Sequence, residues 1–488
     1  MAEKLTNEQQ AAVDSRERSL LVSAAAGSGK TKVLVERLFS YVEREGANLD
    51  DFLIITYTRA AASELRGKIA KALTERMERD PGNYHLRQQM LRVYRADIKT
   101  VDAFCTALLR ENCHLLGEDA RGHVLRPDFR VLDENEAQVL RERVLARTLD
   151  DFYGRLTTGS TLLADTLGAG RDDSALEDLV LELHAKLQAQ PYEDKWLEGQ
   201  RAFWRAVPDK IEDTPYGKIL LNEVRRKARH CKNLLQRAAQ EMCANDALNQ
   251  KYAPAFLDAS YQLEALEGKT AEGWDAARGV TIAFPRLAAV KDSDGGEMKA
   301  RMKSLWDNCK ETVKGFAEIF SASSDEAVED LRTMASAMLA LIDLTADFSR
   351  RYNEEKRRRN SADFSDQEHE AIRLLIGEDG APTELARIVS ARYREIMVDE
   401  YQDTNEVQNR IFDAISCKGE NLFTVGDVKQ SIYRFRLADP RIFLQHYNTW
   451  PPLEDAEEHD SAKLLLSRNF RSRKEVLDAT NFIFCNIL

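Results

Sequence analysis

The 488-residue chain is acidic, with 70 Lys and Arg against 82 Asp and Glu and a formal net charge of −12. This balance excludes a protein that binds nucleic acid through bulk positive charge. The 43% hydrophobic and 31% charged residues exclude a disordered chain and suggest two or three domains. No apolar stretch approaches the roughly 20 residues that span a bilayer. The seven cysteines form no C-x-x-C pair, which favours a reducing cytoplasm over a zinc site.

Glycine and proline are scarce, so we expect a mostly helical chain with few, short strands. Six apolar runs are typical of parallel strands buried on both faces. They are Leu20 to Ser23, Phe52 to Thr56, Ile98 to Val101, Glu395 to Asp399, Leu422 to Gly426 and Lys463 to Leu466. Polar, chemically specific residues closely follow the first five. The sequence therefore predicts an α/β fold with a ligand site beyond the carboxyl ends of its strands.

The residues between the third and fourth runs read almost wholly as helix, which predicts an inserted helical domain. Its clearest element is a helix over about 326 to 359, with an apolar residue every three or four positions from Val328 to Tyr352. This segment also contains two basic runs, Arg225 to Arg229 and Lys356 to Arg359. Such runs form either solvated helix faces or contacts with nucleic-acid phosphates. The sequence alone leaves both interpretations open.

A phosphate-binding motif follows the first strand. The string Ala24-Ala25-Ala26-Gly27-Ser28-Gly29-Lys30-Thr31 is a P-loop with Ala in place of the first Gly of G-x-x-x-x-G-K-[ST]. The glycines allow the loop from Ala26 to Gly29 to curl, so that backbone N–H groups face phosphate oxygens. Lys30 is expected to reach the β and γ phosphates, and Thr31 to ligate Mg²⁺. ATP and Mg²⁺ are therefore the predicted cofactors.

Two acidic residues end the fourth strand, Ile396-Met397-Val398-Asp399-Glu400. Asp399 is placed to hold Mg²⁺, directly or through water. Glu400 is placed to accept a proton from the water that attacks the γ-phosphate. An exposed acidic pair that merely closes a strand is the simpler interpretation of two carboxylates, but it does not account for the whole string Asp399 to Asn405.

Longer motifs extend this pattern in a fixed order: Asp399 to Asn405, Val425 to Pro440 and Leu466 to Arg473. With the P-loop, they resemble superfamily 1 DNA helicases of the UvrD/Rep type, and within them the AddA type of helicase-nuclease subunit. The resemblance implies a RecA-like P-loop NTPase sheet with a large inserted all-helical domain. It places the first part of the ATPase domain at residues 1–120, the helical domain at 121–384 and the second part at 385–488.

The same resemblance assigns roles to individual residues around the nucleotide. Gln9 would read the adenine edge and Phe470 would stack on the base. Gln430 would sense the γ-phosphate, and Arg471 would touch it. These four residues join Lys30, Asp399 and Glu400, which the motifs already place at the ATP.

A second set of residues is implied to face DNA, both the single strand and its junction with the duplex. They are Tyr57, Thr58, Thr100, Tyr433, Phe435 and Arg436. The chain departs from many relatives at Asp102, where His is common, and at Gln367, where Leu is usual. Core packing is the alternative role for Phe435, and also for Phe104 in the segment after Thr100.

The resemblance implies an ATP-dependent 3′–5′ DNA helicase for double-strand break repair and recombination, with an AddB-like partner, in the cytoplasm. The chain shows no counterpart of the family's motifs V and VI or of a nuclease domain. We therefore expect the N-terminal part of a longer protein, which binds ATP but turns it over slowly. Two alternatives stay open: a UvrD-like repair helicase without a nuclease, and a nucleotide-dependent DNA-binding module with little turnover. The absence of N-K-x-D disfavours a GTPase.

Overall fold

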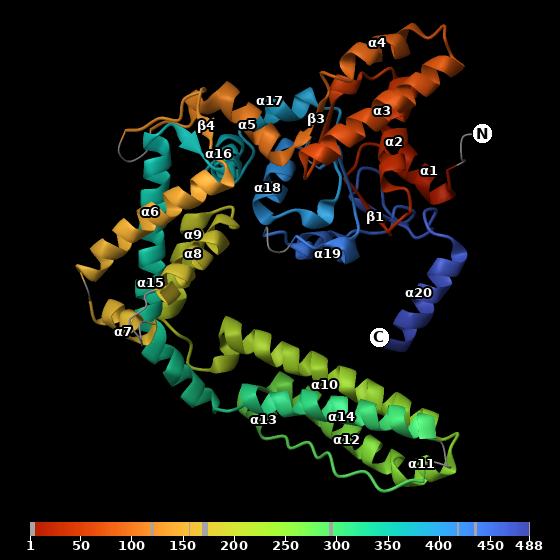
Figure 1. Ribbon diagram of the computed structural model, residues 1–488, viewed down its shortest axis with the longest axis vertical. Coiled ribbons are helices and arrows are strands. Elements are labelled where there is room, and N and C mark those ends of the chain that lie inside the picture. Colours follow the sequence, from red (N-terminus) through yellow and green to blue (C-terminus); the bar gives the residue numbers. More distant parts are fainter. Residues whose placement is uncertain are drawn as a thin grey trace. The chain divides into compact units, whose positions relative to one another are not determined.

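The computed structural model describes residues 5–118, 122–155, 157–167, 174–291, 296–416, 419–433 and 437–487 (Figure 1). The chain divides into two compact units. Unit 1 comprises Met1–Tyr153, Glu177–Trp196 and Leu344–Leu488, and unit 2 comprises Gly154–Leu176 and Leu197–Asp343. The predicted domain boundaries at 120/121 and 384/385 do not coincide with this division, and they stay a prediction.

Unit 1 contains a six-stranded sheet in which every strand pairs in parallel, in the order β3-β2-β6-β7-β1-β8. The strands are β1 (Leu20–Ala24), β2 (Phe52–Thr56), β3 (Asp97–Thr100), β6 (Glu395–Val398), β7 (Leu422–Gly426) and β8 (Ala462–Leu466). All six predicted strands are confirmed, with ends that differ by no more than one residue. Because the strands run in the same direction, the segments that follow them lie together at the carboxyl ends of the strands. We call this side of the sheet its carboxyl edge, and the opposite side its amino edge.

Helices cover both faces of this sheet, because neighbouring residues of each buried strand point to opposite sides. Val22 and Ile54 belong to one hydrophobic cluster, whereas Leu21 and Leu53 belong to the other. The helices of the first cluster are α1 (Asn7–Asp14), α2 (Lys30–Glu45), α3 (Arg59–Arg79) and α4 (Tyr84–Arg92). The helices of the second are α5 (Val101–Asn112), α16 (Phe364–Leu375), α17 (Glu384–Arg392), α18 (Glu406–Ile415) and α19 (Pro440–Thr449).

Unit 1 also contains the helices α6 (Glu134–Tyr153) and α20 (Lys474–Ile487). Its short strands β4 (Arg130–Val131) and β5 (Ser361–Ala362) contact the second cluster through Val131 and Ala362. The two short strands pair in parallel, with Arg130 opposite Ser361. This pair was not predicted, because two-residue strands are too short to show a periodicity.

In its described residues unit 2 is helical, with α7 (Thr158–Leu167), α10 (Pro215–Met242), α11 (Asp246–Lys251), α12 (Ala253–Glu272), α13 (Trp274–Arg278) and α14 (Gly296–Ile319). The ring of Phe256 stacks on Trp306, with centroids 4.8 Å apart, in a core built by α10, α12 and α14.

Three helices extend across the division between the units: α8 (Ser174–Gln188), α9 (Glu193–Arg205) and α15 (Ser324–Arg358). The last confirms the predicted long helix. Among the helices that the structure describes, none combines the length and the apolar character needed to cross a membrane.

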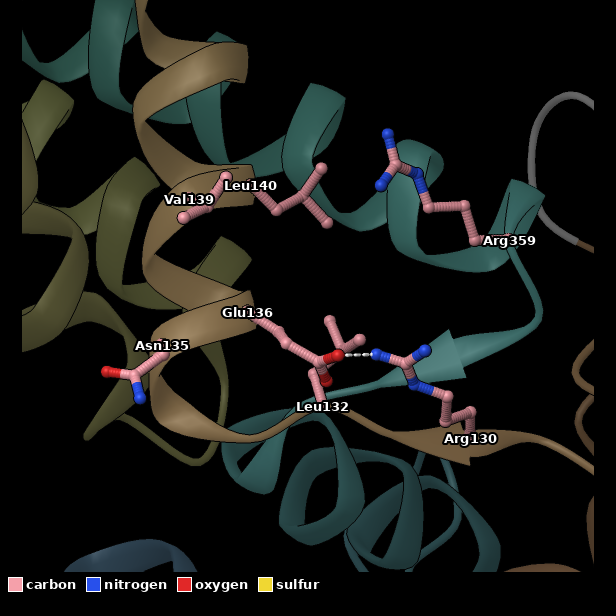
Figure 2. Close-up of a pocket in the computed structure, with 7 residues that line it drawn as sticks. All are labelled: Arg130, Leu132, Asn135, Glu136, Val139, Leu140 and Arg359. Carbon is pink, nitrogen blue, oxygen red and sulfur yellow. Dashed lines mark hydrogen bonds and ion pairs between the residues drawn. The ribbon is translucent and has the colours of Figure 1, made fainter.

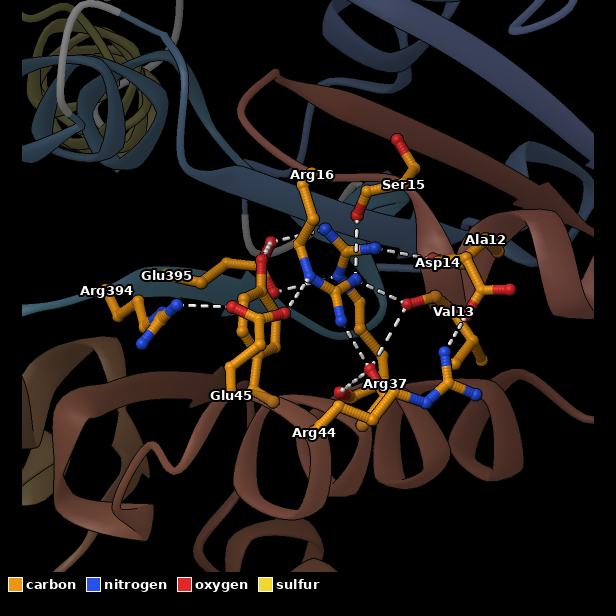
Figure 3. A network of polar contacts seen from close by, with 12 residues as sticks. Ala12, Val13, Asp14, Ser15, Arg16, Arg37, Arg44, Glu45, Arg394 and Glu395 are labelled. Carbon is orange, nitrogen blue, oxygen red and sulfur yellow. Dashed lines mark hydrogen bonds and ion pairs between the residues drawn. The ribbon is translucent and has the colours of Figure 1, made fainter.

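A buried ion pair joins α2 to the start of β6 (Figure 3). The side chains of Arg37 and Glu395 are 0% and 2% exposed. Arg37 donates from Nε to one carboxylate oxygen of Glu395 at 2.8 Å and from Nη2 to the other at 2.5 Å. It also donates to the carbonyl oxygen of Ala12, and the Tyr41 hydroxyl donates to Glu395 at 3.1 Å. This network lies at the amino-terminal edge of the sheet, opposite the predicted ligand site.

We expect Arg37→Met to lower the free energy of unfolding of unit 1 by about 3 to 5 kcal/mol, because it leaves the Glu395 carboxylate buried without its partner. Urea denaturation followed by circular dichroism measures the change. The matched control is Arg44→Gln on the same helix, whose ion pair with Asp14 is 60% and 43% exposed and contributes at most about 1 kcal/mol. A variant Arg37→Met that unfolds at the wild-type urea concentration would contradict the role of the pair.

Candidate active site

The P-loop connects β1 to α2 with a tightly curled backbone. Gly27 and Gly29 both have left-handed conformations, with φ of 73° and 86°, and the Ser28 N–H donates to the Ala25 carbonyl at 3.1 Å. α2 begins at Lys30, and the first N–H groups of a helix have no acceptor within the helix. The loop therefore has the form of a helix N-terminus that binds anions. Phosphate binding by Ala26 to Thr31 itself stays a prediction.

Two observations fit this loop to a bound triphosphate. The Ser28 hydroxyl is buried and has no hydrogen-bond partner among the described residues, so it is available to an acceptor oxygen. A Cβ atom on Gly27 would lie 2.7 Å from Cβ of Arg471 and 2.9 Å from the Asn469 side-chain oxygen. The P-loop at Gly27 therefore packs closely against the segment after β8, next to Arg471, which is predicted to contact the γ-phosphate.

A contact between the P-loop lysine and the acidic pair joins two predicted motifs. Lys30 Nζ lies 3.0 Å from Oε2 of Glu400, although the residues are 370 positions apart in the chain. The same oxygen accepts a hydrogen bond from Nε2 of Gln402 at 2.8 Å. Glu400 itself has a left-handed backbone, with φ of 52°, which is uncommon for a residue other than glycine. The turn after β6 is thus shaped to hold this carboxylate against the P-loop.

Asp399 lies beside this contact, in an environment that disfavours its charged form. Its backbone N–H donates to Ile55 in β2 at 3.0 Å, and its carboxylate accepts from the Glu400 N–H at 3.0 Å. Burial, followed by the charge of Glu400, raises the pKa of Asp399 to about 6. A nearby cation would favour the charged form. One carboxylate and the hydroxyl of Thr31, in the first turn of α2, are the donor types that Mg²⁺ accepts beside phosphates and water.

The segment after β8 closes over the P-loop. The Asn469 side chain donates to the Ala26 carbonyl at 2.9 Å, and the Phe470 N–H donates to the Gly27 carbonyl at 2.8 Å. The side-chain oxygen of Asn469 accepts from the N–H of Arg471 at 2.8 Å. The Phe470 ring is 42% exposed, which leaves it accessible to a base. The structure thus brings Phe470 and Arg471 to the P-loop.

The role of Asn469 was missed in the sequence, although it lies in the string that carries Phe470 and Arg471. Its position three residues after β8 is only a weak signal, because a carboxamide near the end of a strand has no diagnostic spacing. Gln402 was missed in the same way. Its amide links Glu400 to the Asp427 N–H, from which its oxygen accepts at 2.9 Å.

Gln9 is engaged by the protein at both ends of its amide. Its oxygen accepts from the Thr6 N–H at 3.1 Å in a capping box, and its nitrogen donates to the Ser28 carbonyl at 2.9 Å. The side chain thus lies against the P-loop, and recognition of adenine by Gln9 stays a prediction. In the segment after β7, the Gln430 amide donates to Asp427 at 2.7 Å.

The predicted DNA-facing residues lie at the carboxyl edge where they are described. Thr58 and Thr100 each cap a helix, accepting from Ala61 at 3.0 Å and Ala103 at 3.2 Å. The Tyr57 hydroxyl forms a hydrogen bond of 2.5 Å with Thr404. Tyr433 is partly buried, whereas Phe435 and Arg436 lie outside the described residues.

Phe104 is 4% exposed and packs in the second cluster, which supports the core-packing alternative for it. Gln367 is fully buried, and its amide oxygen accepts from the Thr106 hydroxyl. A hydrogen bond thus satisfies the amide of Gln367 in this buried position.

The basic runs are paired within the protein. Lys356 is buried and lies 2.9 Å from Asp363 and 2.7 Å from Asp366. Arg358 and Arg359 both pair with Glu355. The remaining pairs are Arg357 with Glu370, Arg226 and Lys227 with Glu223, and Arg229 with Glu267. Because acidic residues of the protein pair with these cations, the contacts favour the interpretation of the basic runs as solvated helix faces over contacts with nucleic-acid phosphates.

A hollow of about 330 Å³ lies apart from the P-loop, between α6, β4 and the end of α15 (Figure 2). Arg130 forms an ion pair with Glu136 inside it. The residues that line it are Arg130, Leu132, Asn135, Glu136, Val139, Leu140 and Arg359. It contains none of the residues that the motifs predict.

Comparisons with known proteins agree with this geometry. The model of the UvrD/REP helicase N-terminal domain matches residues 5–451. The chain is 36% identical to the A subunit of the ATP-dependent helicase/nuclease of Acetivibrio thermocellus, over 99% of this chain and 39% of the relative. The protein of the same name from Desulfitobacterium hafniense is 37% identical, over 99% of this chain and 36% of the relative. The chain thus spans less than two fifths of the length of these relatives.

We expect Gly27→Ala to weaken nucleotide binding by about 5- to 150-fold, because a clash of this kind costs roughly 1 to 3 kcal/mol. The added Cβ would displace Arg471 and break the contact of Asn469 with Ala26. Titration with a fluorescent ATP analogue measures the affinity. Gly46→Ala is the matched control, because Gly46 has a similar φ of 70° but open space around it. Equal affinities for the two variants would show that the close fit is unimportant.

Proposed function

Because the chain belongs to the UvrD/REP helicase family, we propose that it forms the ATP-binding motor part of a DNA helicase-nuclease of the AddA type. The parent protein would unwind duplex DNA during double-strand break repair and recombination, in the cytoplasm and with an AddB-like partner. Similarity to the A subunits of ATP-dependent helicase/nucleases over 99% of this chain supports the proposal. The 3′–5′ direction follows from the same resemblance.

The observation that carries the proposal is the contact between Lys30 and Glu400 at 3.0 Å. It joins a phosphate-binding loop to a carboxylate that can act as a general base, and both leave the sheet at its carboxyl edge. A parallel sheet of this kind, with helices on both faces, supports a RecA-like domain. In this proposal residues 121–384 form the inserted helical domain between its two parts.

The chain's own residues would perform three tasks at this edge. The P-loop backbone and Lys30 would hold the β and γ phosphates, while Gln9 and Phe470 would fix the adenine. Glu400 would orient the attacking water and accept its proton. Bound at Thr31 and Asp399, Mg²⁺ would neutralise charge that develops on the phosphates. Gln430 and Arg471 would contact the γ-phosphate.

DNA would lie across the same carboxyl edge, where Tyr57, Thr58, Thr100 and Tyr433 are placed. The proposed DNA contacts of Phe435 and Arg436 rest on the sequence motif alone. Aromatic stacking binds single strands with little dependence on base identity, because every base has a π face. This arrangement would let nucleotide and DNA contacts share the turns that follow the same strands.

A second candidate function is a nucleotide-dependent DNA-binding module with slow turnover. The position of Glu400 favours it: the carboxylate that would activate water is held by both Lys30 and Gln402. The two candidates differ in the rate of hydrolysis and agree on ATP binding, so one set of variants tests both.

We expect Lys30→Ala to abolish measurable ATP binding, because the variant lacks the ammonium group proposed to hold the β and γ phosphates. Glu400→Gln is expected to lower hydrolysis while tightening ATP binding by about two- to fivefold, since a partly exposed ion pair that competes for Lys30 is worth up to about 1 kcal/mol. A fluorescent ATP analogue measures affinity, and phosphate release measures turnover with and without oligo-dT.

The matched control is Glu384→Gln, which removes a charge at a 77% exposed position far along the chain from the P-loop. Its affinity and turnover should equal those of the wild type. DNA-stimulated hydrolysis that survives Glu400→Gln would show that Glu400 is not the base. Wild-type hydrolysis that DNA does not stimulate would favour the second candidate.

A further inference from the structure

A single hydroxyl–hydroxyl contact connects the turn after β2 to the acidic segment after β6. Tyr57 is the first residue beyond β2, and Thr404 follows the short 3-10 helix Tyr401–Asp403. The two side-chain oxygens lie 2.5 Å apart, and the residues are 347 positions apart in the chain. The contact therefore joins the predicted DNA side of the sheet edge to the segment that begins at Asp399 and Glu400.

Both partners of this contact are well held. Thr404 is fully buried. Its N–H donates to the Tyr401 carbonyl at 3.2 Å, and its carbonyl accepts from the Asp439 N–H at 3.0 Å. The Tyr57 ring packs against the second hydrophobic cluster, and burial raises the pKa of its hydroxyl well above the usual value. The tyrosine thus stays protonated, and the hydrogen bond persists across the ordinary pH range.

The acidic segment also has a contact that bound phosphate would compete with. Lys30 here pairs with Glu400, and phosphate oxygens at the P-loop would attract the same ammonium group and weaken its hold on this carboxylate. Gln402 donates a hydrogen bond to the same Glu400 oxygen. A movement of the Glu400 carboxylate would therefore also shift Gln402 and the 3-10 helix that contains it, which directly precedes Thr404. In this way a change at Lys30 reaches Thr404 through two side-chain contacts, Lys30 with Glu400 and Glu400 with Gln402, and then through the backbone from Gln402 to Thr404.

We propose that the Tyr57–Thr404 hydrogen bond couples the nucleotide site to the DNA site, with Tyr57 as a positioning residue that reports the state of the acidic segment to the DNA edge. The proposal rests on the function proposed above. Coupling of this kind appears as a change in DNA affinity on nucleotide binding, and it is reciprocal. Its magnitude is limited by what one neutral hydrogen bond contributes, about two- to tenfold in an equilibrium constant.

The test compares DNA affinities of the full chain with and without nucleotide. Fluorescence anisotropy with a labelled oligo-dT gives the Kd in Mg²⁺, first alone and then with a saturating non-hydrolysable ATP analogue. The quantity of interest is the ratio of the two Kd values for one variant. A change in DNA contact that is common to both conditions cancels in this ratio.

Tyr57→Phe removes only the hydroxyl and keeps the ring, and Thr404→Val removes only the partner hydroxyl. Each should move the ratio toward 1 by about two- to tenfold. The double variant should do no more than either single change, since both remove the same contact. The melting temperature shows whether each variant is folded, and the two single variants approach the contact from opposite sides.

The matched control is Tyr393→Phe. Tyr393 is also a buried tyrosine, 4% exposed, two residues before β6, and its hydroxyl donates to Asp97, the first residue of β3, at 2.6 Å. This variant deletes a tyrosine hydrogen bond near the amino ends of the strands, away from the proposed sites, and it should leave the ratio at the wild-type value.

Three results would overturn the inference. The first is a wild-type ratio of 1, and the second is an unchanged ratio in both Tyr57→Phe and Thr404→Val. The third is an equal shift in Tyr393→Phe, because general loosening of the sheet would then explain the effect. These outcomes are distinct from failure of the proposed function, in which the wild-type chain would bind no nucleotide or no DNA.

Discussion

The parallel direction of all six strands of the sheet is the constraint on which the site depends. Each connection leaves its strand at the same edge of the sheet. Segments that are hundreds of positions apart in the sequence therefore lie close together there. The turns after β1, β2, β6, β7 and β8 supply, in that order, Lys30, Tyr57, Glu400, Asp427 and Asn469. No single loop would have to be long to assemble the nucleotide cradle.

The two edges of the sheet differ in how charge is balanced. At the amino edge, Arg37 and Glu395 satisfy one another fully in a buried pair. At the carboxyl edge, three carboxylates, Asp399, Glu400 and Asp403, gather around Lys30. Burial and then the charge of Glu400 raise the pKa of both Asp399 and Asp403 to about 6. The excess negative charge thus lies where a divalent cation would bind. The buried pair of Arg37 and Glu395, in which the charges are balanced, lies at the opposite edge.

The strands, the long helix α15 and the P-loop could be predicted because each has a local signal: a buried apolar run, a repeat of three or four residues, or a fixed spacing of glycines and lysine. The contacts between motifs could not. Nothing in a single sequence states that Lys30 meets Glu400, or that Arg37, in an otherwise ordinary amphipathic helix, is buried against Glu395. Asn469 and Gln402 were missed because a carboxamide has no diagnostic spacing.

The position of β1 between β7 and β8 has a consequence for synthesis on the ribosome. Both neighbours of β1, the strands β7 and β8, come from the last part of the chain. At about 5 to 20 residues per second, the apolar segment Leu20–Ala24 waits roughly 20 to 90 s before both of them emerge. Meanwhile β2 and β3 can already pair with each other. The nascent chain therefore carries an unpaired, strongly apolar strand until β8 has emerged, and a chaperone that binds this segment would protect it during that interval.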